Sequence, residues 1–186
     1  KTAQAAANGK WMLKLDPLKA SAEPREMTIR ASGGTSRTLR DILVGEVWMA
    51  SGQSNMQWPA GNSNASALVD QLKQQAQAAG GKRAPVREFK VTNYYAHLHP
   101  IEHAEGEWSE NYADFSAIAF AFAHKLYQEL GVPVGILNCS FSQTSIEAWT
   151  PRSGYQNSQS EYNQKIEAQL LRTDPATPEH ARAWSA

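Results

Sequence analysis

Residues 43–56 of this 186-residue chain read LVGEVWMASGQSNM, and this stretch decides the fold. Its first eight residues are mostly apolar, which is typical of a strand buried on both faces in a parallel sheet. The small and polar residues 51–54 follow at once and predict a sharp turn. Ligands of open parallel sheets bind beyond the carboxyl ends of the strands. We therefore expect Ser54, which stands just beyond such an end, to face a binding site.

Toward the C-terminus, helix and strand patterns alternate. The pattern predicts a helix over 62–79, a strand over 86–91, a helix from Asp114 or Ser116 to Leu130, a strand over 134–139 and a helix from Ser158 to about Arg172. The last helix is predicted from Ser158 and Glu161, which have the spacing of a capping box. Such alternation is typical of an α/β domain whose parallel strands are joined by right-handed crossovers, and three strands make about half of such a sheet.

Toward the N-terminus, the signals are those of β-structure. Short alternating runs at 11–15, 27–30 and 37–39 are separated by turn residues. Three short strands bury too little surface to form a core alone. We therefore interpret residues 1–43 as the last strands of an N-terminal β-sandwich or jelly-roll domain, and residues 44–186 as the α/β domain.

Composition excludes several classes of protein. Eighteen Lys and Arg residues balance eighteen Asp and Glu, which leaves no electrostatic footprint for nucleic acid or an anionic membrane. No stretch approaches the ~18 consecutive apolar residues of a membrane span. The single cysteine, Cys139, excludes an internal disulfide and a Cys-rich zinc site. The chain opens on Lys1 and shows no signal peptide, so we expect its natural start to have been removed.

The turn around Ser54 has the composition that presents a nucleophile. Gly52 allows the chain to turn closely, and the amides at the start of the following helix stabilise negative charge on a reacting oxygen. On spacing alone, however, the same residues also fit an ordinary Ser/Gly/Asn turn at the end of a strand.

A longer match favours the nucleophile. Residues 45–59, GEVWMASGQSNMQWP, resemble the signature of the sialate O-acetylesterase family, a branch of the SGNH hydrolases related to the acetylxylan esterases of carbohydrate esterase family 6. Residues 115–130, 132–137 and 144–149 resemble later segments of that family, so the resemblance runs from about residue 10 to 155. It implies the first half of a flavodoxin-like, three-layer α/β/α sandwich, and a secreted, periplasmic or lysosomal setting.

The resemblance also implies a mechanism. Ser54 attacks an acetyl carbonyl of an O-acetylated sugar, and water hydrolyses the resulting acetyl-enzyme, with no cofactor. The backbone N–H of Ser54 and Gln143, through its N–H or its carboxamide, are the predicted oxyanion donors. The family usually has two glycines where this chain has Ser142 and Gln143. Gln53 and Asn93 are the predicted substrate contacts.

The catalytic base is not apparent. The family supplies its Asp and His from an Asp-x-x-His block near its C-terminus, and this sequence contains no such block. His97, His99 and His103 have a spacing that also suits zinc, but no acidic or cysteine partner stands at ligand spacing, so we predict no metal site. We expect the base to come from a further C-terminal portion of the same protein or from a second polypeptide, without which the chain is inactive.

The sequence is compatible with three functions. The first is a serine esterase that removes O-acetyl groups from sialic acids or, alternatively, from xylan. The second is a carbohydrate-binding pseudoenzyme that has lost turnover, motivated by Ser142, Gln143 and the missing base. The third is a purely structural fragment.

Overall fold

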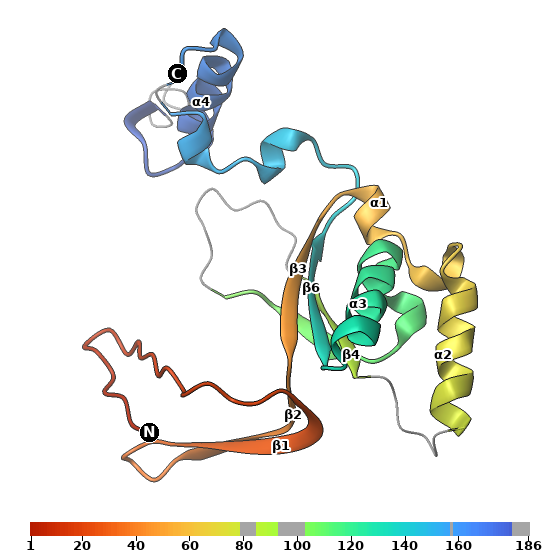
Figure 1. Ribbon diagram of the computed structural model, residues 1–186. Coiled ribbons are helices and arrows are strands. Elements are labelled where there is room, and N and C mark those ends of the chain that lie inside the picture. Colours follow the sequence, from red (N-terminus) through yellow and green to blue (C-terminus); the bar gives the residue numbers. More distant parts are fainter. Residues whose placement is uncertain (79–84, 93–102, 157, 180–186) are drawn as a thin grey trace.

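The computed structural model describes residues 1–78, 85–92, 103–156 and 158–179, and its centre is a four-stranded sheet. Strands β3 (Glu46–Gly52), β6 (Val134–Ser140) and β4 (Val86–Val91) are parallel, and β5 (Gly106–Ser109) pairs antiparallel with β4. The order across the sheet is β3-β6-β4-β5 (Figure 1). The predicted α/β class with a mostly parallel sheet is confirmed, whereas β5 was not predicted.

Helices cover one face of this sheet (Figure 1). The two long helices are α2 (Ser66–Ala78) and α3 (Ala117–Leu130). Two short helices, α1 (Ser54–Gln57) and η1 (Ala60–Asn62), lie between β3 and α2, and η2 (Tyr112–Asp114) lies between β5 and α3. The core beneath them includes Phe115, Phe120 and Ile136, each about 1% exposed or less. Burying one such side chain stabilises the fold by about 1.5–3 kcal/mol. The described residues thus supply two of the three layers that the resemblance implies.

Helix α3 begins and ends where the sequence predicts. The Ser116 hydroxyl accepts a hydrogen bond from the Ala119 N–H at 3.2 Å and caps the helix. Gly131 follows the last turn with φ 65°, in the left-handed region, and its N–H donates to the Tyr127 carbonyl. These two caps fix both ends of α3.

Strand β3 is exposed, contrary to the prediction that it is buried on both faces. Val47 is 61%, Trp48 44% and Met49 70% exposed. The physical reason lies in the topology. Within the described part of the chain, β3 pairs with β6 on one side only, and no helix covers the face opposite α3.

The N-terminal region is a two-stranded antiparallel ribbon of β1 (Ser21–Arg30) and β2 (Ser36–Val44). The strand predicted at 11–15 is wrong, because no described strand runs beside that segment to accept its backbone hydrogen bonds. The expected boundary between residues 43 and 44 stays a prediction. Gly45 joins β2 to β3 where a Cβ would lie 2.0 Å from the Pro133 carbonyl oxygen, so only glycine fits there.

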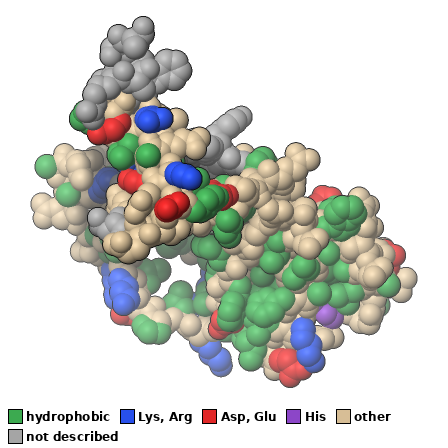
Figure 2. Space-filling model, turned by 90° about the horizontal axis from the view of Figure 1, so that it is seen from above, with side chains coloured by type: hydrophobic (Ala, Val, Ile, Leu, Met, Phe, Trp, Pro, Cys, Tyr) green, Lys and Arg blue, Asp and Glu red, His purple; other side chains and the backbone are tan. Residues whose placement is uncertain are grey.

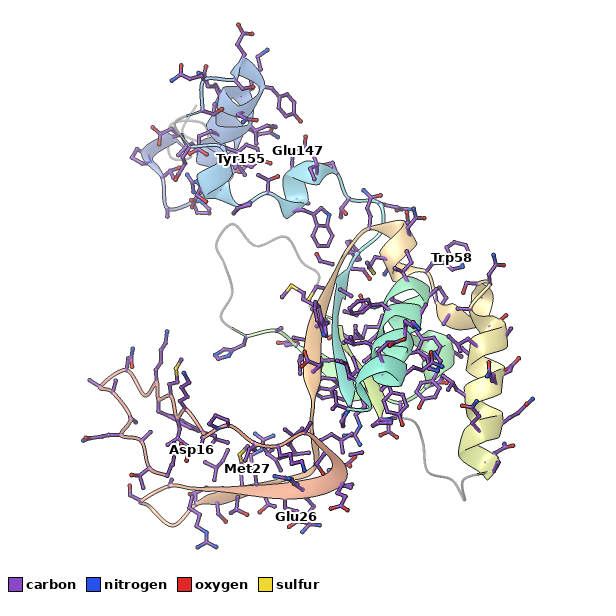
Figure 3. All side chains as sticks on the ribbon, viewed as in Figure 1. Asp16, Glu26, Met27, Trp58, Glu147 and Tyr155 are labelled. Carbon is purple, nitrogen blue, oxygen red and sulfur yellow. The ribbon has the colours of Figure 1, made fainter. Side chains whose placement is uncertain are left out.

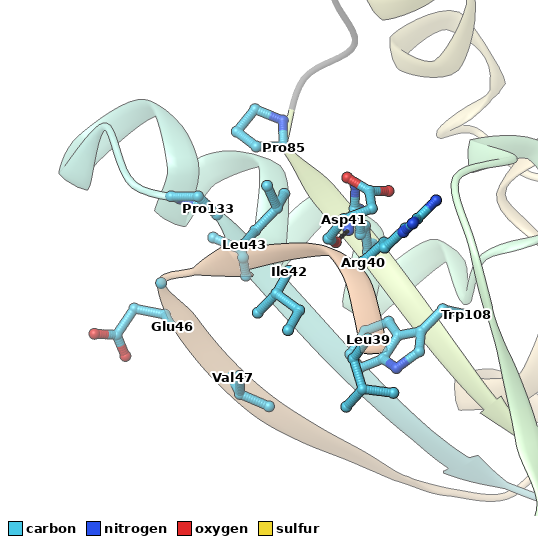
Figure 4. A pocket seen from close by; sticks show the side chains of 14 residues that line it. Leu39, Arg40, Asp41, Ile42, Leu43, Glu46, Val47, Pro85, Trp108 and Pro133 are labelled. Carbon is cyan, nitrogen blue, oxygen red and sulfur yellow. Dashed lines mark hydrogen bonds and ion pairs between the residues drawn. The ribbon is translucent and has the colours of Figure 1, made fainter. Parts of the chain in front are cut away.

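A cavity of about 450 Å³ separates the ribbon from the amino ends of the parallel strands (Figure 4). Its labelled lining includes Leu39 and Ile42 from β2, and Trp108 from β5. At its rim the Arg87 guanidinium forms ion pairs with Asp41 at 2.7 Å and Glu110 at 2.9 Å. The ion pair with Asp41 connects the ribbon to the sheet, and the one with Glu110 joins β4 to the end of β5.

The segment after the sheet forms a small lobe with η3 (Ile146–Trp149), η4 (Arg152–Gly154) and α4 (Glu161–Thr173), and Figure 3 places Glu147 and Tyr155 in it. Helix α4 starts after Ser160, so the predicted cap at Ser158 is wrong; the Ser158 hydroxyl instead accepts from the Ser160 N–H at 3.2 Å. Basic and acidic side chains are interspersed on the face seen in Figure 2. None of the described helices is long and apolar enough to cross a membrane.

Candidate active site

Ser54 lies just beyond the carboxyl end of β3, as the first residue of α1, and its side chain is exposed. Gly52, the last residue of β3, has φ 150°, a backbone conformation that other residues rarely adopt. A Cβ at Gly52 would lie 3.1 Å from the Met56 Cβ. Glycine therefore lets the chain turn sharply and holds the hydroxyl of Ser54 above the sheet.

The loop after β6, residues 141–144, lies beside this turn, because β3 and β6 are parallel neighbours with Gly52 paired to Ser140. Three hydrogen bonds join the two segments. The Phe141 N–H donates to the Gly52 carbonyl at 2.9 Å, and the Gln53 carboxamide donates to the Thr144 carbonyl. The third runs from the Ser142 N–H to the Gln57 side-chain oxygen at 2.8 Å.

Gln143 has an unusual backbone conformation. Its φ of 62° lies in the left-handed region that favours glycine, which is the residue that the resemblance leads one to expect there. The neighbouring amides of Phe141 and Ser142 already donate to Gly52 and Gln57. The N–H of Gln143, by contrast, has no hydrogen-bond acceptor among the described residues. This amide is therefore free to bind an anionic oxygen, although its catalytic role stays a prediction.

A cavity of about 310 Å³ opens next to the turn at residues 52–54. It is lined by Ser51, Gly52, Gln53, Ile146 and Trp149. The Trp149 indole N–H donates to the Thr144 hydroxyl at 2.8 Å, so this ring supports the loop and also forms a wall of the cavity. Gln53, a predicted substrate contact, thus lines this cavity, and its role stays a prediction. Asn93, the other predicted contact, lies outside the described residues.

A buried polar network that the sequence analysis missed lies beneath both loops. The Glu88 carboxylate on β4 accepts from the Ser116 N–H at 3.0 Å and from the Asn138 carboxamide at 3.1 Å. Burial raises the pKa of Glu88 above its ordinary value of 4.5, and the hydrogen bond from Asn138 opposes that shift. The sequence shows only a polar residue within each of two predicted strands, Glu88 and Asn138, and the structure shows that both are buried.

No described histidine takes the place of the catalytic base. His124 is buried on α3 beside Phe120, and desolvation lowers its pKa, as for a structural imidazole. His103 precedes β5, which is three strand spacings or about 14 Å of sheet from β3. His97, His99 and His180 lie outside the described residues. Among the described residues, no three His, Cys, Asp or Glu side chains gather to hold a metal ion.

Comparisons with known proteins match most of the chain. Residues 44–174 match the family model of the carbohydrate esterases described as sialic acid-specific acetylesterases. The chain is 29% identical over 153 residues to the sialate O-acetylesterase of Mus musculus, covering 76% of this chain and 27% of that protein. It is 26% identical over 151 residues to the sialate O-acetylesterase of Homo sapiens, and this match covers 75% of this chain and 28% of that protein.

One solved structure is similar throughout most of the chain. The crystal structure of a carbohydrate acetylesterase from Xanthomonas citri superposes with a TM-score of 0.67 and 32% sequence identity. The match covers 81% of this chain and 34% of that protein. The chain therefore spans between a quarter and about a third of the length of the relatives that it matches.

Proposed function

This chain belongs to the sialic acid-specific acetylesterase family of carbohydrate esterases, and on that premise we propose that it carries the nucleophile of a serine esterase acting on O-acetylated sugars. The observation that carries the proposal is an exposed Ser54 held beside a loop with a free backbone amide. The Ser54 hydroxyl loses its proton to a base while its oxygen bonds to the acetyl carbon. The sugar oxygen then leaves with a proton, and water releases acetate from the acetyl-enzyme.

The N–H groups of Ser54 and Gln143 stabilise the oxyanion in this proposal. Two observations support the backbone amide of Gln143: its left-handed φ, and the hydrogen bonds that already occupy the amides of Phe141 and Ser142. Removing one donor of this kind typically costs about 10²–10³ in rate. Gln53 and Asn93 are proposed to contact the sugar.

The base and its orienting carboxylate come from a complementary portion carrying Asp-x-x-His, either a further part of the same protein or a second polypeptide. The open edge of β3 supports a docking place for that portion. Val47, Trp48 and Met49 are exposed along it, and an unpaired strand edge is a ready template for another strand. Hydrogen exchange of the β3 amides, measured with and without the complementary portion, tests this: unchanged exchange would contradict docking at β3.

The proposed substrate is an O-acetylated sialic acid, since the matched family model and relatives carry that specificity in their descriptions. Acetylated xylan is the alternative, because the matched crystal structure is described only as a carbohydrate acetylesterase. Release of acetate from each sugar distinguishes the two. We further propose a secreted, periplasmic or lysosomal setting, on the resemblance alone.

Ser54→Ala, assayed in the complete assembly with nitrophenyl acetate, tests the nucleophile. Ser51→Ala is a matched control, because Ser51 is an exposed serine three residues before Ser54, near the end of β3. We expect Ser54→Ala to abolish nitrophenol release and Ser51→Ala to leave it largely intact. An unchanged rate in Ser54→Ala contradicts the esterase. Binding of acetylated sugar by a wild-type assembly without turnover would instead favour the pseudoenzyme.

A mass spectrum of the purified natural protein tests the origin of the base. We expect either one longer chain or a second polypeptide, in both cases with an Asp-x-x-His block. Full activity of residues 1–186 alone would contradict the need for a complementary portion.

A further inference from the structure

Glu88 is a buried carboxylate whose two hydrogen-bond donors are both neutral. Its side chain is 2% exposed on the helix-covered face of β4. One oxygen accepts from the Ser116 N–H at 3.0 Å, and the other accepts from the Asn138 carboxamide at 3.1 Å. Burying a charge without a cationic partner is costly, so a core made only for stability favours an apolar side chain there.

Each of the two donors leads to one loop of the candidate active site. Asn138 turns its oxygen toward Ser140, accepting from that residue's N–H at 3.0 Å and from its hydroxyl at 2.5 Å. Ser140 is the last residue of β6 and leads directly into the loop that carries Gln143. On the other side, the Ser116 hydroxyl contacts the Met56 sulfur at 3.3 Å, in the helix that begins with Ser54.

We propose that Glu88 is a positioning residue. It sets the loop 141–144, which carries Gln143, against the turn 52–54, which carries Ser54. This inference rests on the proposed function and goes beyond it. With both of its oxygens accepting, the carboxylate fixes which end of the Asn138 carboxamide faces it. The carboxamide oxygen must then face Ser140, and this orders the start of the loop.

Glu88→Gln perturbs this polarity without changing the shape of the side chain. Its one oxygen remains for the Ser116 N–H, and its new NH₂ faces the NH₂ of Asn138. Asn138 must then turn over and present a donor to the Ser140 N–H. A small misplacement of a catalytic group costs up to about a hundredfold, so we expect kcat to fall about 10- to 100-fold, with KM changed less than about twofold.

The reciprocal change restores the polarity. In Glu88→Gln combined with Asn138→Asp, the glutamine donates to one aspartate oxygen, and the other oxygen again accepts from Ser140. We expect this double variant to recover kcat to within about threefold of wild type, and Asn138→Asp alone, with two facing carboxylates, to be impaired. A role in stability alone predicts no such recovery of kcat.

Val86→Ala is the matched control for stability. Val86 is fully buried on the same face of β4, two residues before Glu88 and toward the end of the strand away from both loops. We expect this variant to lower the melting temperature while kcat stays within about twofold of wild type, because a cavity there leaves the loop bonds intact.

Hydrogen exchange of the peptide 138–144 gives a readout that does not depend on catalysis. We expect faster exchange of the Ser140 amide in Glu88→Gln, recovery in the double variant, and no change in Val86→Ala. Unchanged exchange in Glu88→Gln, or a double variant that does not recover, overturns the inference. If the wild-type assembly shows no turnover dependent on Ser54, the proposed function fails, and the exchange data alone decide the role of Glu88.

Discussion

Replacing Gln143 separates two kinds of oxyanion donor and measures the strain of the loop at the same time. A non-glycine residue in the left-handed region costs about 1–2 kcal/mol, and φ at Gln143 is 62°. Glycine removes this cost but gains freedom in the unfolded chain, which offsets about 0.4–1 kcal/mol. We therefore expect Gln143→Gly to raise the free energy of unfolding by about 0.5–1 kcal/mol, or the melting temperature by about 1–4 °C in a domain of this size. Gln143→Ala keeps the Cβ and so keeps the strain.

Both variants lack the carboxamide and retain the backbone N–H, so their activities identify the donor. If the backbone amide binds the oxyanion, nitrophenyl acetate hydrolysis by the complete assembly stays within a few-fold of wild type in both. A loss of about 10²–10³ in both variants would show that the carboxamide is the donor and refute the backbone assignment. Equal melting temperatures of the glycine and alanine variants would refute the argument from strain.

The remaining predictions concern three other positions. Gly52→Ala should lower the melting temperature and kcat together, because the new Cβ meets Met56 at a backbone φ of 150°; unchanged values of both would contradict a requirement for glycine. Gln57→Met should lower kcat by removing the acceptor of the Ser142 N–H, whereas Gln57→Glu keeps an acceptor and should retain kcat; steady-state kinetics of the pair decides. The pKa of His124 is lowered, so around and below pH 6.5 the folded state binds fewer protons than the unfolded state. The free energy of unfolding of wild type should therefore fall as the pH falls through and below 6.5, and that of His124→Phe should fall less. Denaturant titrations at a series of pH values measure both.

Elements with a strong local signal were predictable from the sequence. Helix α3 has a capping serine, a terminal glycine and apolar residues at helical spacing, and the structure ends it at the predicted residue. Strand β5 has no such signal in its four residues, and it forms because Val91 and its neighbours on β4 offer a partner. The alternating run at 11–15 shows the opposite case, a strand pattern without a described partner. In both cases, pairing with a segment elsewhere in the chain decides whether a strand forms, and the local pattern of apolar residues does not reveal that pairing.

The same division holds within the candidate site. The turn that carries Ser54 could be identified from the sequence because it is one continuous stretch, residues 51–56, that a motif can carry, and the role of Ser54 as nucleophile stays a prediction. The bond between Gln57 and Ser142 joins residues 85 positions apart, and that between Glu88 and Asn138 joins residues 50 apart. Such contacts become visible only when the fold brings the strands together. The sequence does mark Gln143 as a departure from glycine, and the structure supplies the physical meaning of that departure, a left-handed φ.

Ser54 directly follows β3, an edge strand of the described sheet, and this place in the fold bears on how its hydroxyl could be activated. The three hydrogen bonds that join the region of Ser54 to the loop after β6 lie on the side of β3 where β6 runs. The other side of β3 is open within the described residues, and Val47 and Met49 are exposed along it. A strand added there in parallel would bring its own carboxyl end about 4.8 Å from that of β3, at the level of Ser54. Under the proposed function, strand pairing and delivery of the base are then one event, so the exposed edge is stabilised and the hydroxyl is activated together.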